Sequence, residues 1–284
     1  MHYLRIIASI LLLLPAVYAD ARKGVYNNIE RALENGADVQ VLKLASSGLD
    51  ELPDVFHNFP NLEELNINVN TITRLPPSLF TCSHLRVIKC LRNKIEAIPP
   101  AIGRLKELEE LHMSFNEIKT ISDSIGYLPN LRELNLRNNM LSSLPRTIGK
   151  LENLEVLRLS YNWLTSLPGE IAGLTQLSFF DVCDNRLESL PPEIGKLANL
   201  QMFFMARNVL GEIPNTIGQC QKLKEADFVR CGVMRLPQSL ADIYSLEFVY
   251  VDERTVCFYP NPRSRFRQKI VVVDPGVEPY RPIQ

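Results

Sequence analysis

The sequence contains none of the short motifs that mark the common enzyme families. The phosphate-binding pattern G-x-x-x-x-G-K-[ST], the zinc pattern H-E-x-x-H, the redox pair C-x-x-C and the acyl-transfer pattern G-x-S-x-G are all absent from its 284 residues. Their absence removes the usual routes to phosphate, metal, redox and acyl chemistry. We therefore expect no enzyme activity and no cofactor.

Cysteine is scarce, and its spacing predicts neither a disulfide framework nor a metal site. The chain has 6 cysteines, and Cys183, Cys231 and Cys257 are scattered without a recognisable pattern. Cys82 and His84 stand close together, but a zinc site takes three or four protein ligands. We expect no bound metal.

An excess of either charge is also missing. The 31 basic and 32 acidic residues leave a formal net charge of −1. A nucleic-acid groove or a surface that binds acidic lipids needs a concentrated basic charge. We therefore expect no nucleic-acid partner.

Only the first 19 residues contain a long hydrophobic run. Arg5 precedes an apolar segment at Ile6–Val17, and the small residue Ala19 follows, which is the layout of a signal peptide cleaved before Asp20. The run is too short to span a bilayer, which takes roughly 20 apolar residues. The sequence thus predicts a signal peptide at 1–19, a secreted or extracellular product and no stable membrane insertion after cleavage. The alternative is a hydrophobic helix that caps the repeats of a cytoplasmic protein.

What the sequence does contain is one unit of 23 residues, repeated without an insertion over 39–258. The first position of about ten units is apolar: Val39, Leu62, Leu85, Leu108, Leu131, Leu154, Leu177, Leu200, Leu223 and Leu246. A single unit is too small to bury its own leucines. The units must therefore stack into a solenoid.

The segment 131–153, LRELNLRNNMLSSLPRTIGKLEN, shows how one unit folds. Leu134 and Leu136 alternate with polar residues, which predicts a short strand with one inward face. Pro145 cannot lie in a central strand and predicts the start of a returning turn. This proline recurs in nearly every unit, with Ser122 as the exception.

Asparagine occupies the ninth position of seven units: Asn70, Asn93, Asn116, Asn139, Asn162, Asn185 and Asn208. A buried asparagine is costly unless its amide is hydrogen-bonded. We predict a structural ladder in which these side chains bond the free backbone groups of the bend between stacked units.

These units closely resemble the leucine-rich repeat family over 39–258. The 23-residue length and the LPxxI turn are most similar to the intracellular Ras-group class, which includes Scribble, Erbin and the Ras-suppressor proteins. The resemblance implies an α/β solenoid, a horseshoe with a parallel β-sheet on its concave face. It also implies a protein-binding role and does not identify the partner.

The two ends of a repeat array need polar covers. Residues 20–38 place Val25, Ile29, Ala32 and Leu33 at helical spacing, which predicts an N-terminal capping helix. Residues 259–284 predict a C-terminal cap with a strand at Ile270–Val273, followed by an extended proline-rich tail.

The outward strand positions predict where a partner binds. In the early units these positions are mixed and mostly polar: Val41, Lys43, Glu64, Asn66, Val87, Lys89, Glu110 and His112. From the seventh unit they change to a group of large apolar residues, interrupted by Glu225 and Asp227: Phe179, Met202, Phe204, Phe248 and Tyr250. Clustered aromatic groups on an exposed sheet are typical of binding hot spots. The alternative is that the C-terminal flank folds back over Phe248 and Tyr250.

Repeat spacing also excludes the one catalytic pair that the composition offers. Cys183 and His112 both occupy outward positions, but they lie three units apart, which is ~14 Å at ~4.8 Å per strand. A nucleophile and its base need contact at about 3 Å. The leading hypothesis is a non-enzymatic, exported module that binds a protein on its concave face. The alternative is a cytosolic scaffold or regulator in Ras-type or phosphatase signalling.

Overall fold

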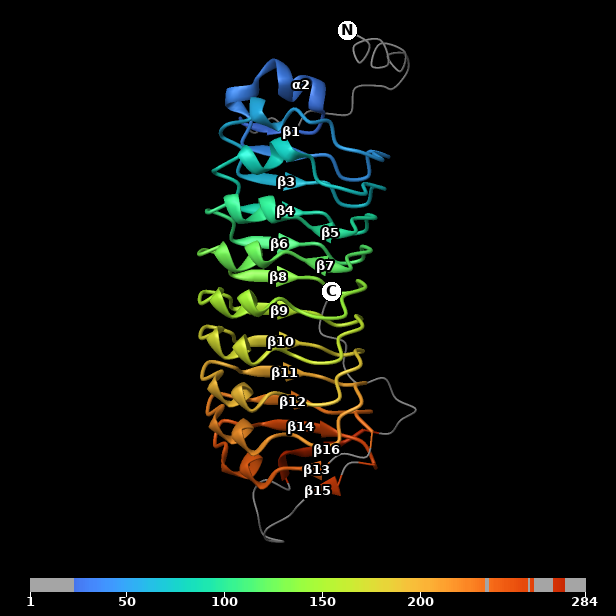
Figure 1. Ribbon diagram of the computed structural model, residues 1–284, viewed down its shortest axis with the longest axis vertical. Helices are drawn as coiled ribbons and strands as arrows, with labels where there is room; N and C mark the ends of the chain where they lie inside the picture. Colours follow the sequence, from blue (N-terminus) through green and yellow to red (C-terminus); the bar gives the residue numbers. More distant parts are fainter. Residues whose placement is uncertain (1–22, 233–234, 255, 258–267, 274–284) are drawn as a thin grey trace.

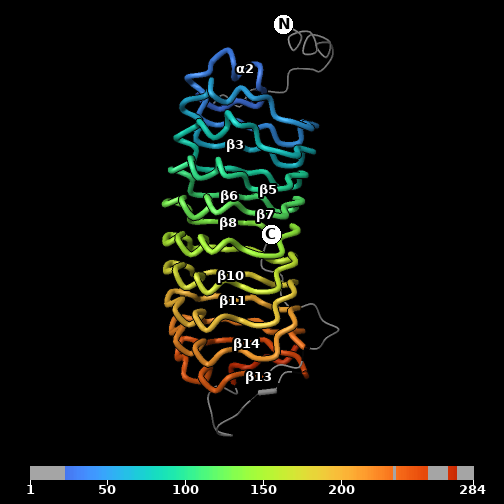
Figure 2. Tube along the Cα trace, in the orientation of Figure 1, coloured from blue at the N-terminus to red at the C-terminus, as the bar shows by residue number. Residues whose placement is uncertain are grey.

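The chain folds into a solenoid built around one parallel sheet of 12 strands (Figure 1). The computed structural model describes residues 23–232, 235–254, 256–257 and 268–273. Successive repeats stack along the long axis, with the strands on one side and short helical turns on the other (Figure 2). The predicted leucine-rich repeat solenoid is confirmed.

The strands of the large sheet follow one another in the order β1-β2-β3-β4-β6-β8-β9-β10-β11-β12-β14-β16. They are β1 (Val25–Tyr26), β2 (Val41–Lys43), β3 (Glu64–Asn66), β4 (Val87–Lys89), β6 (Glu110–His112), β8 (Glu133–Asn135), β9 (Val156–Arg158), β10 (Phe179–Asp181), β11 (Met202–Phe204), β12 (Glu225–Asp227), β14 (Phe248–Val251) and β16 (Ile270–Val272). Two further pairs, β5 (Ala97–Ile98) with β7 (Thr120–Ile121) and β13 (Arg235–Leu236) with β15 (Val256–Cys257), lie outside this sheet.

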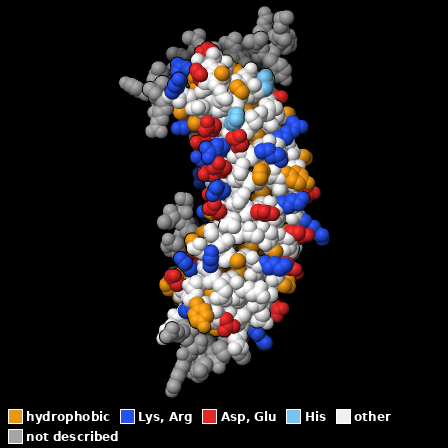
Figure 3. All heavy atoms as spheres, turned by 90° about the vertical axis from the view of Figure 1, so that its left-hand side faces the viewer, with side chains coloured by type: hydrophobic (Ala, Val, Ile, Leu, Met, Phe, Trp, Pro, Cys, Tyr) orange, Lys and Arg blue, Asp and Glu red, His pale blue; other side chains and the backbone are white. Residues whose placement is uncertain are grey.

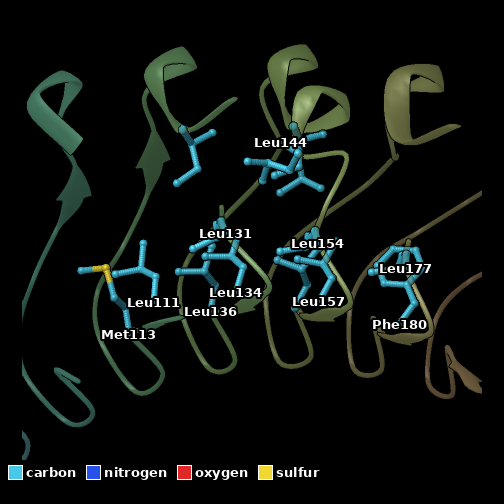
Figure 4. Close-up of a cluster of buried hydrophobic side chains, with 14 of the residues drawn as sticks. Leu111, Met113, Leu131, Leu134, Leu136, Leu144, Leu154, Leu157, Leu177 and Phe180 are labelled. Atoms are coloured by element: carbon cyan, nitrogen blue, oxygen red, sulfur yellow. The ribbon is translucent and has the colours of Figure 1, made fainter. Parts of the chain in front are cut away.

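The register of the sheet is the repeat length itself. Leu111 of β6 pairs with Leu134 of β8, and Leu134 pairs with Leu157 of β9. All three leucines are buried, as is Leu136, and equivalent leucines of neighbouring repeats pack against one another in the interior (Figure 4). Each repeat thus buries its apolar face on the repeat before and the repeat after it.

Phenylalanine replaces leucine in the core of the later repeats, and neighbouring positions compensate for its size. Phe180 and Phe203 stack with ring centroids 5.4 Å apart, and Phe203 meets Phe228 edge-on at 6.5 Å. Phe228 stands two residues after Ala226, whose small side chain faces the same interior. The interior therefore stays filled although individual side chains change in volume.

The chain returns through 3-10 helices, and seven of them, η3, η4 and η6 to η10, begin directly after the recurrent proline. The ten 3-10 segments of the described residues are η1 (Gly36–Asp38), η2 (Phe56–Asn58), η3 (Pro77–Thr81), η4 (Pro100–Arg104), η5 (Asp123–Tyr127), η6 (Arg146–Lys150), η7 (Gly169–Gly173), η8 (Pro192–Lys196), η9 (Asn215–Gln219) and η10 (Gln238–Asp242). Where the proline is missing, the Ser122 hydroxyl accepts a hydrogen bond from the Ser124 backbone and caps η5 instead.

The N-terminal end is only partly the helix that the sequence predicts. A helix, α2 (Ile29–Glu34), is present, but Val25 belongs to β1, which pairs with β2. Ala32 of α2 is buried, whereas Leu33, expected on the same inward face, is exposed. The free edge of β2 favours pairing with β1 over a longer helix. The predicted signal peptide at 1–19 lies outside the described residues.

The C-terminal end adds one more strand to the sheet. The strand β16 pairs in parallel with β14, in agreement with the strand expected near Ile270. In this position β16 extends the sheet, and Phe248 on β14 keeps 46% of its surface exposed. The rest of the predicted cap and tail lies outside the described residues.

Candidate functional site

The outward side chains of the sheet form the concave face. At the edge of the sheet where each strand ends, the asparagine ladder holds the bend of the chain in place. The Asn139 Nδ2 amide donates to the Leu136 carbonyl of its own repeat and to the Met113 carbonyl of the preceding one, both at 3.0 Å. Its Oδ1 accepts from the Ile118 backbone N–H at 3.0 Å. The same three contacts recur at Asn93, Asn116, Asn162, Asn185 and Asn208, and Asn70 holds the first bend in a similar way.

The residue before the ninth position of the repeat, where most repeats carry the ladder asparagine, adopts a left-handed backbone conformation. Nine successive repeats share this feature, with φ between 52° and 60°, at Ser46, Val69, Arg92, Phe115, Asn138, Tyr161, Asp184, Arg207 and Arg230. Such angles are costly for residues other than glycine, asparagine and aspartate. The bonds to adjacent repeats, such as Asn138 N–H to the Ser160 carbonyl at 2.8 Å, hold the bend in place. Sequence reasoning missed this feature because glycine never marks it.

The N-terminal half of the concave face is a lattice of ion pairs between neighbouring strands. Lys89 contacts Glu64 at 2.9 Å, and Arg158 pairs with Glu133. His112 lies 3.0 Å from Glu110 and 3.8 Å from Glu133. Figure 3 shows acidic and basic side chains intermingled over this half of the molecule. Its charges are therefore largely compensated within the chain.

The C-terminal half of the face carries the predicted aromatic patch, defined as Phe179, Met202, Phe204, Phe248 and Tyr250. Met202 is 38% exposed and Phe248 is 46% exposed, while Phe179 and Tyr250 are half-buried. Phe248 and Tyr250 stack on each other with ring centroids 6.2 Å apart. These four side chains present an apolar surface on the outer side of the sheet.

Phe204, which the sequence predicts as part of the exposed patch, is buried. It occupies an outward strand position, as expected, but only 8% of its surface is exposed. In the register of the sheet it lies between Asp181 and Asp227, and the ring of Phe179 packs against it edge-on at 5.5 Å. Phe204 therefore supports the patch from below and contributes little accessible surface.

Carboxylates lie among these apolar groups and are themselves largely buried. Asp181 and Asp227 are each 8% exposed, and their Oδ1 atoms accept hydrogen bonds from the backbone N–H groups of Cys183 and Val229. Burial raises the pKa of Asp227 to about 6. The Val229 hydrogen bond lowers this pKa, neighbouring Glu225 and Asp181 raise it, and Arg207 lowers it. This half of the face thus holds negative charge in a poorly hydrated setting.

The structure separates the one catalytic pair that the composition offers, Cys183 and His112. Burial, together with the carboxylates of Asp181 and Asp227, raises the pKa of the Cys183 thiol well above its ordinary value, so the thiolate is disfavoured. His112 lies on β6, three strands from β10, and contacts glutamates instead. Within the described part of the chain no group of three or more His, Cys, Asp or Glu side chains is arranged to hold a metal ion.

A second group of exposed aromatic residues follows the bend at the edge of the sheet. Phe115, Tyr161 and Trp163 are 36%, 38% and 46% exposed. Each is covered on one side by a guanidinium group: Arg92, Arg137 and Arg186 lie 5.5, 5.0 and 5.7 Å from the respective ring centroids. These contacts within the chain already use part of each aromatic surface.

Comparison with known families identifies the repeats. A model described as "Leucine rich repeat" matches residues 60–118 and 83–141, and a model described as "Leucine-rich repeat region" matches residues 117–207. The chain is a leucine-rich repeat protein. The comparison with curated proteins gave no match.

Among solved structures, the chain is similar to two receptors. The leucine-rich repeat ectodomain of the membrane receptor kinase GASSHO1/SCHENGEN3 from Arabidopsis thaliana, solved in complex with Casparian strip integrity factor 2, is 28% identical with a TM-score of 0.72. The alignment covers 84% of this chain and 30% of that one. A TDR receptor is 26% identical with a TM-score of 0.63, over 80% of this chain and 46% of that one. The chain thus spans less than half the length of either receptor chain.

None of the helices in the described ranges has the length and apolar character needed to cross a membrane. The longest 3-10 segments have five residues, and α2 has six.

Proposed function

We propose that this leucine-rich repeat protein is a non-enzymatic interaction module that binds a protein ligand on the C-terminal half of its concave face. The observation that carries the proposal is the exposure of Met202 and Phe248 on the outer side of a fully formed sheet. Aromatic and methionine side chains are enriched in the centres of protein interfaces. Phe179 and Tyr250 continue the same surface.

The similar plant ectodomain supports this role by analogy, since it was solved in complex with Casparian strip integrity factor 2. The apolar start of the sequence adds the proposal that the protein is exported after cleavage before Asp20. N-terminal sequencing of the protein from secreting cells tests export. An intact Met1 in the cytosol would contradict it.

A cytosolic scaffold or regulator in Ras-type or phosphatase signalling is the second candidate. The 23-residue LPxxI repeat resembles the intracellular Ras-group class. Cys82, Cys90, Cys183, Cys220 and Cys231 are all free thiols, and four of them are buried. A protein without disulfides among its described residues suits a reducing compartment.

Replacing two exposed groups of the patch tests the binding face. We expect Met202→Ala with Phe248→Ala to weaken binding at least tenfold, because buried interface anchors commonly contribute more than ~2 kcal/mol each. The ligand is isolated by pull-down with the 20–284 protein, and its Kd is measured by surface plasmon resonance. Phe204 is left intact because its removal would open space within the packed face.

Tyr244→Ala is the matched control. Tyr244 is 95% exposed and follows η10 on the turn side of the solenoid. If Tyr244→Ala abolishes binding and the double variant does not, the ligand binds the turn side and the proposal fails.

A further inference from the structure

The two halves of the concave face differ in charge as well as in polarity. From the second to the sixth repeat, the outward strand and bend positions carry three carboxylates, Glu64, Glu110 and Glu133, and four permanent cations, Lys89, Arg92, Arg137 and Arg158. Over the four repeats that follow they carry six carboxylates, Asp181, Asp184, Glu225, Asp227, Asp252 and Glu253, and two arginines, Arg207 and Arg230. The aromatic patch therefore lies in the acidic half.

The carboxylates of the two halves also differ in their partners. Each of the three in the first half lies within 4 Å of a lysine, arginine or histidine nitrogen. Asp184 in the second half pairs with Arg207 at 3.2 Å. By contrast, no basic nitrogen of a described residue lies within 4 Å of a carboxylate oxygen of Asp181, Glu225 or Asp227.

These three carboxylates alternate with the aromatic groups across the strands. The sheet register places Asp181, Phe204, Asp227 and Tyr250 side by side on successive strands. At ~4.8 Å per strand this row is ~14 Å long. Such a length accommodates several residues of an extended chain, whereas a single small ion would contact only a fraction of it.

A lysine or arginine side chain matches this alternation better than any other. Its aliphatic stem packs on apolar surface while its charged head reaches a carboxylate. The chain already contains such a contact at the edge of the patch itself, where the Arg158 guanidinium lies 4.8 Å from the centroid of Phe179 and pairs with Glu133. A partner that supplied further cations would neutralise Asp181, Glu225 and Asp227 in the same manner.

From this charge complementarity we propose that the occupant of the aromatic patch is an extended segment of another protein that presents lysine or arginine beside apolar side chains. This inference rests on the proposed function and specifies its partner. Binding of an acidic segment is disfavoured, because it would place like charges together in a poorly hydrated site.

Selection from a display library of random peptides tests the proposal on the intact 20–284 protein at near-neutral pH. We expect the selected peptides to be enriched in lysine and arginine next to aromatic or aliphatic residues. Their affinity should fall at least tenfold for the triple variant Asp181→Asn, Glu225→Gln and Asp227→Asn, and it should weaken as salt rises.

The matched control is the triple variant Glu64→Gln, Glu110→Gln and Glu133→Gln, which neutralises the same number of carboxylates where the chain already pairs them. The control should retain the affinity of the intact protein. Selected peptides that are acidic or without charge bias overturn the inference. If binding of such peptides still requires Met202 and Phe248, the proposed function stands and only the inference about the partner's charge fails. If no selected peptide requires the concave face, the inference and the proposed function both fail.

One further outcome identifies a different occupant. Arg281 and the apolar residues near it in the sequence have the same chemistry as the proposed partner. Arg281 lies outside the described residues. If peptides bind the Arg281→Ala variant of the 20–284 protein and not the unchanged 20–284 protein, the C-terminal segment of this chain competes for the face. The proposal of a segment from another protein is then overturned.

Discussion

At the residue scale, the sequence predicts inward positions well and outward positions only in part. The leucine at the first position and the asparagine at the ninth repeat without exception through the central repeats, because stacking gives each of them the same neighbours in every repeat. The low exposure of Phe204 could not be predicted, because it depends on which side chains of the two adjacent strands lie beside it in the register of the sheet. The burial of Asp227 could not be predicted from the sequence for the same reason.

The ladder asparagines permit a direct test. Asn139→Leu removes the amide that bonds Leu136 and Met113 and leaves the Ile118 N–H without its acceptor. We expect a loss of roughly 1–3 kcal/mol in the free energy of unfolding, measured by urea denaturation. Asn135→Ser on the outward side of β8 is the control and should change stability little. Equal losses would contradict the assigned inward and outward roles.

The buried carboxylate of Asp227 predicts a dependence of stability on pH. Its pKa is raised from 3.8 to about 6 in the folded protein, mainly by burial, so the folded state binds the proton more tightly than the unfolded state. Its contribution to stability is therefore most favourable below the unfolded pKa and is lost as pH rises through 6. Nearby Glu225 and Asp181 act in the same direction, and Arg207 opposes them.

Asp227→Asn removes the ionisation while keeping an acceptor for the Val229 N–H. We expect the variant to be more stable than the native chain near neutral pH, by on the order of 2–3 kcal/mol, and the difference to disappear at about pH 4. Urea denaturation at the two pH values measures this difference. A variant that is less stable near neutral pH would show that an unrecognised cation compensates Asp227.

At the scale of elements, the repeat length and the LPxxI pattern predict strand, bend and return in the correct order. The return adopts 3-10 geometry, which the apolar spacing does not specify over so few residues. The N-terminal cap was predicted least well. The spacing of Val25 fits a helix face, but in the structure Val25 pairs with β2 and so covers the otherwise free edge of the sheet. Pairing at the edge depends on the assembled sheet, and the local spacing of apolar residues does not predict it.

The close packing of successive 3-10 helices explains a recurrent glycine. A Cβ atom added at Gly149 of η6 would collide with the backbone carbonyl of Glu170 at η7. We expect Gly149→Ala to destabilise the fold by about 1–3 kcal/mol, because rigid backbone must move apart.

Gly211→Ala is the comparison, since no heavy atom lies within 4 Å of the Cβ position at Gly211. Thermal unfolding followed by circular dichroism measures both variants. A Gly149→Ala variant as stable as Gly211→Ala would contradict the tight stacking of the return segments.

At the scale of the whole molecule, one repeated unit produces a scaffold whose two halves differ in surface chemistry. The core is continuous from the first repeat to the last, so the difference is confined to side chains that the fold does not need. In the first half of the concave face, the carboxylates pair with basic side chains of the chain itself. The second half combines exposed apolar groups with the carboxylates of Asp181, Glu225 and Asp227, which form no ion pair with a described residue. This contrast supports the proposed binding face.

Hydroxyl-radical footprinting of the 20–284 protein, with and without a bound peptide from the selection, tests this location most directly. Methionine and aromatic side chains react when exposed, and the chain carries such groups on several surfaces. We predict that bound peptide protects Met202 and Phe248 and leaves Trp163 at the bend and Tyr244 on the turn side unchanged. Protection of Trp163 or Tyr244, with Met202 and Phe248 still reactive, would contradict the account.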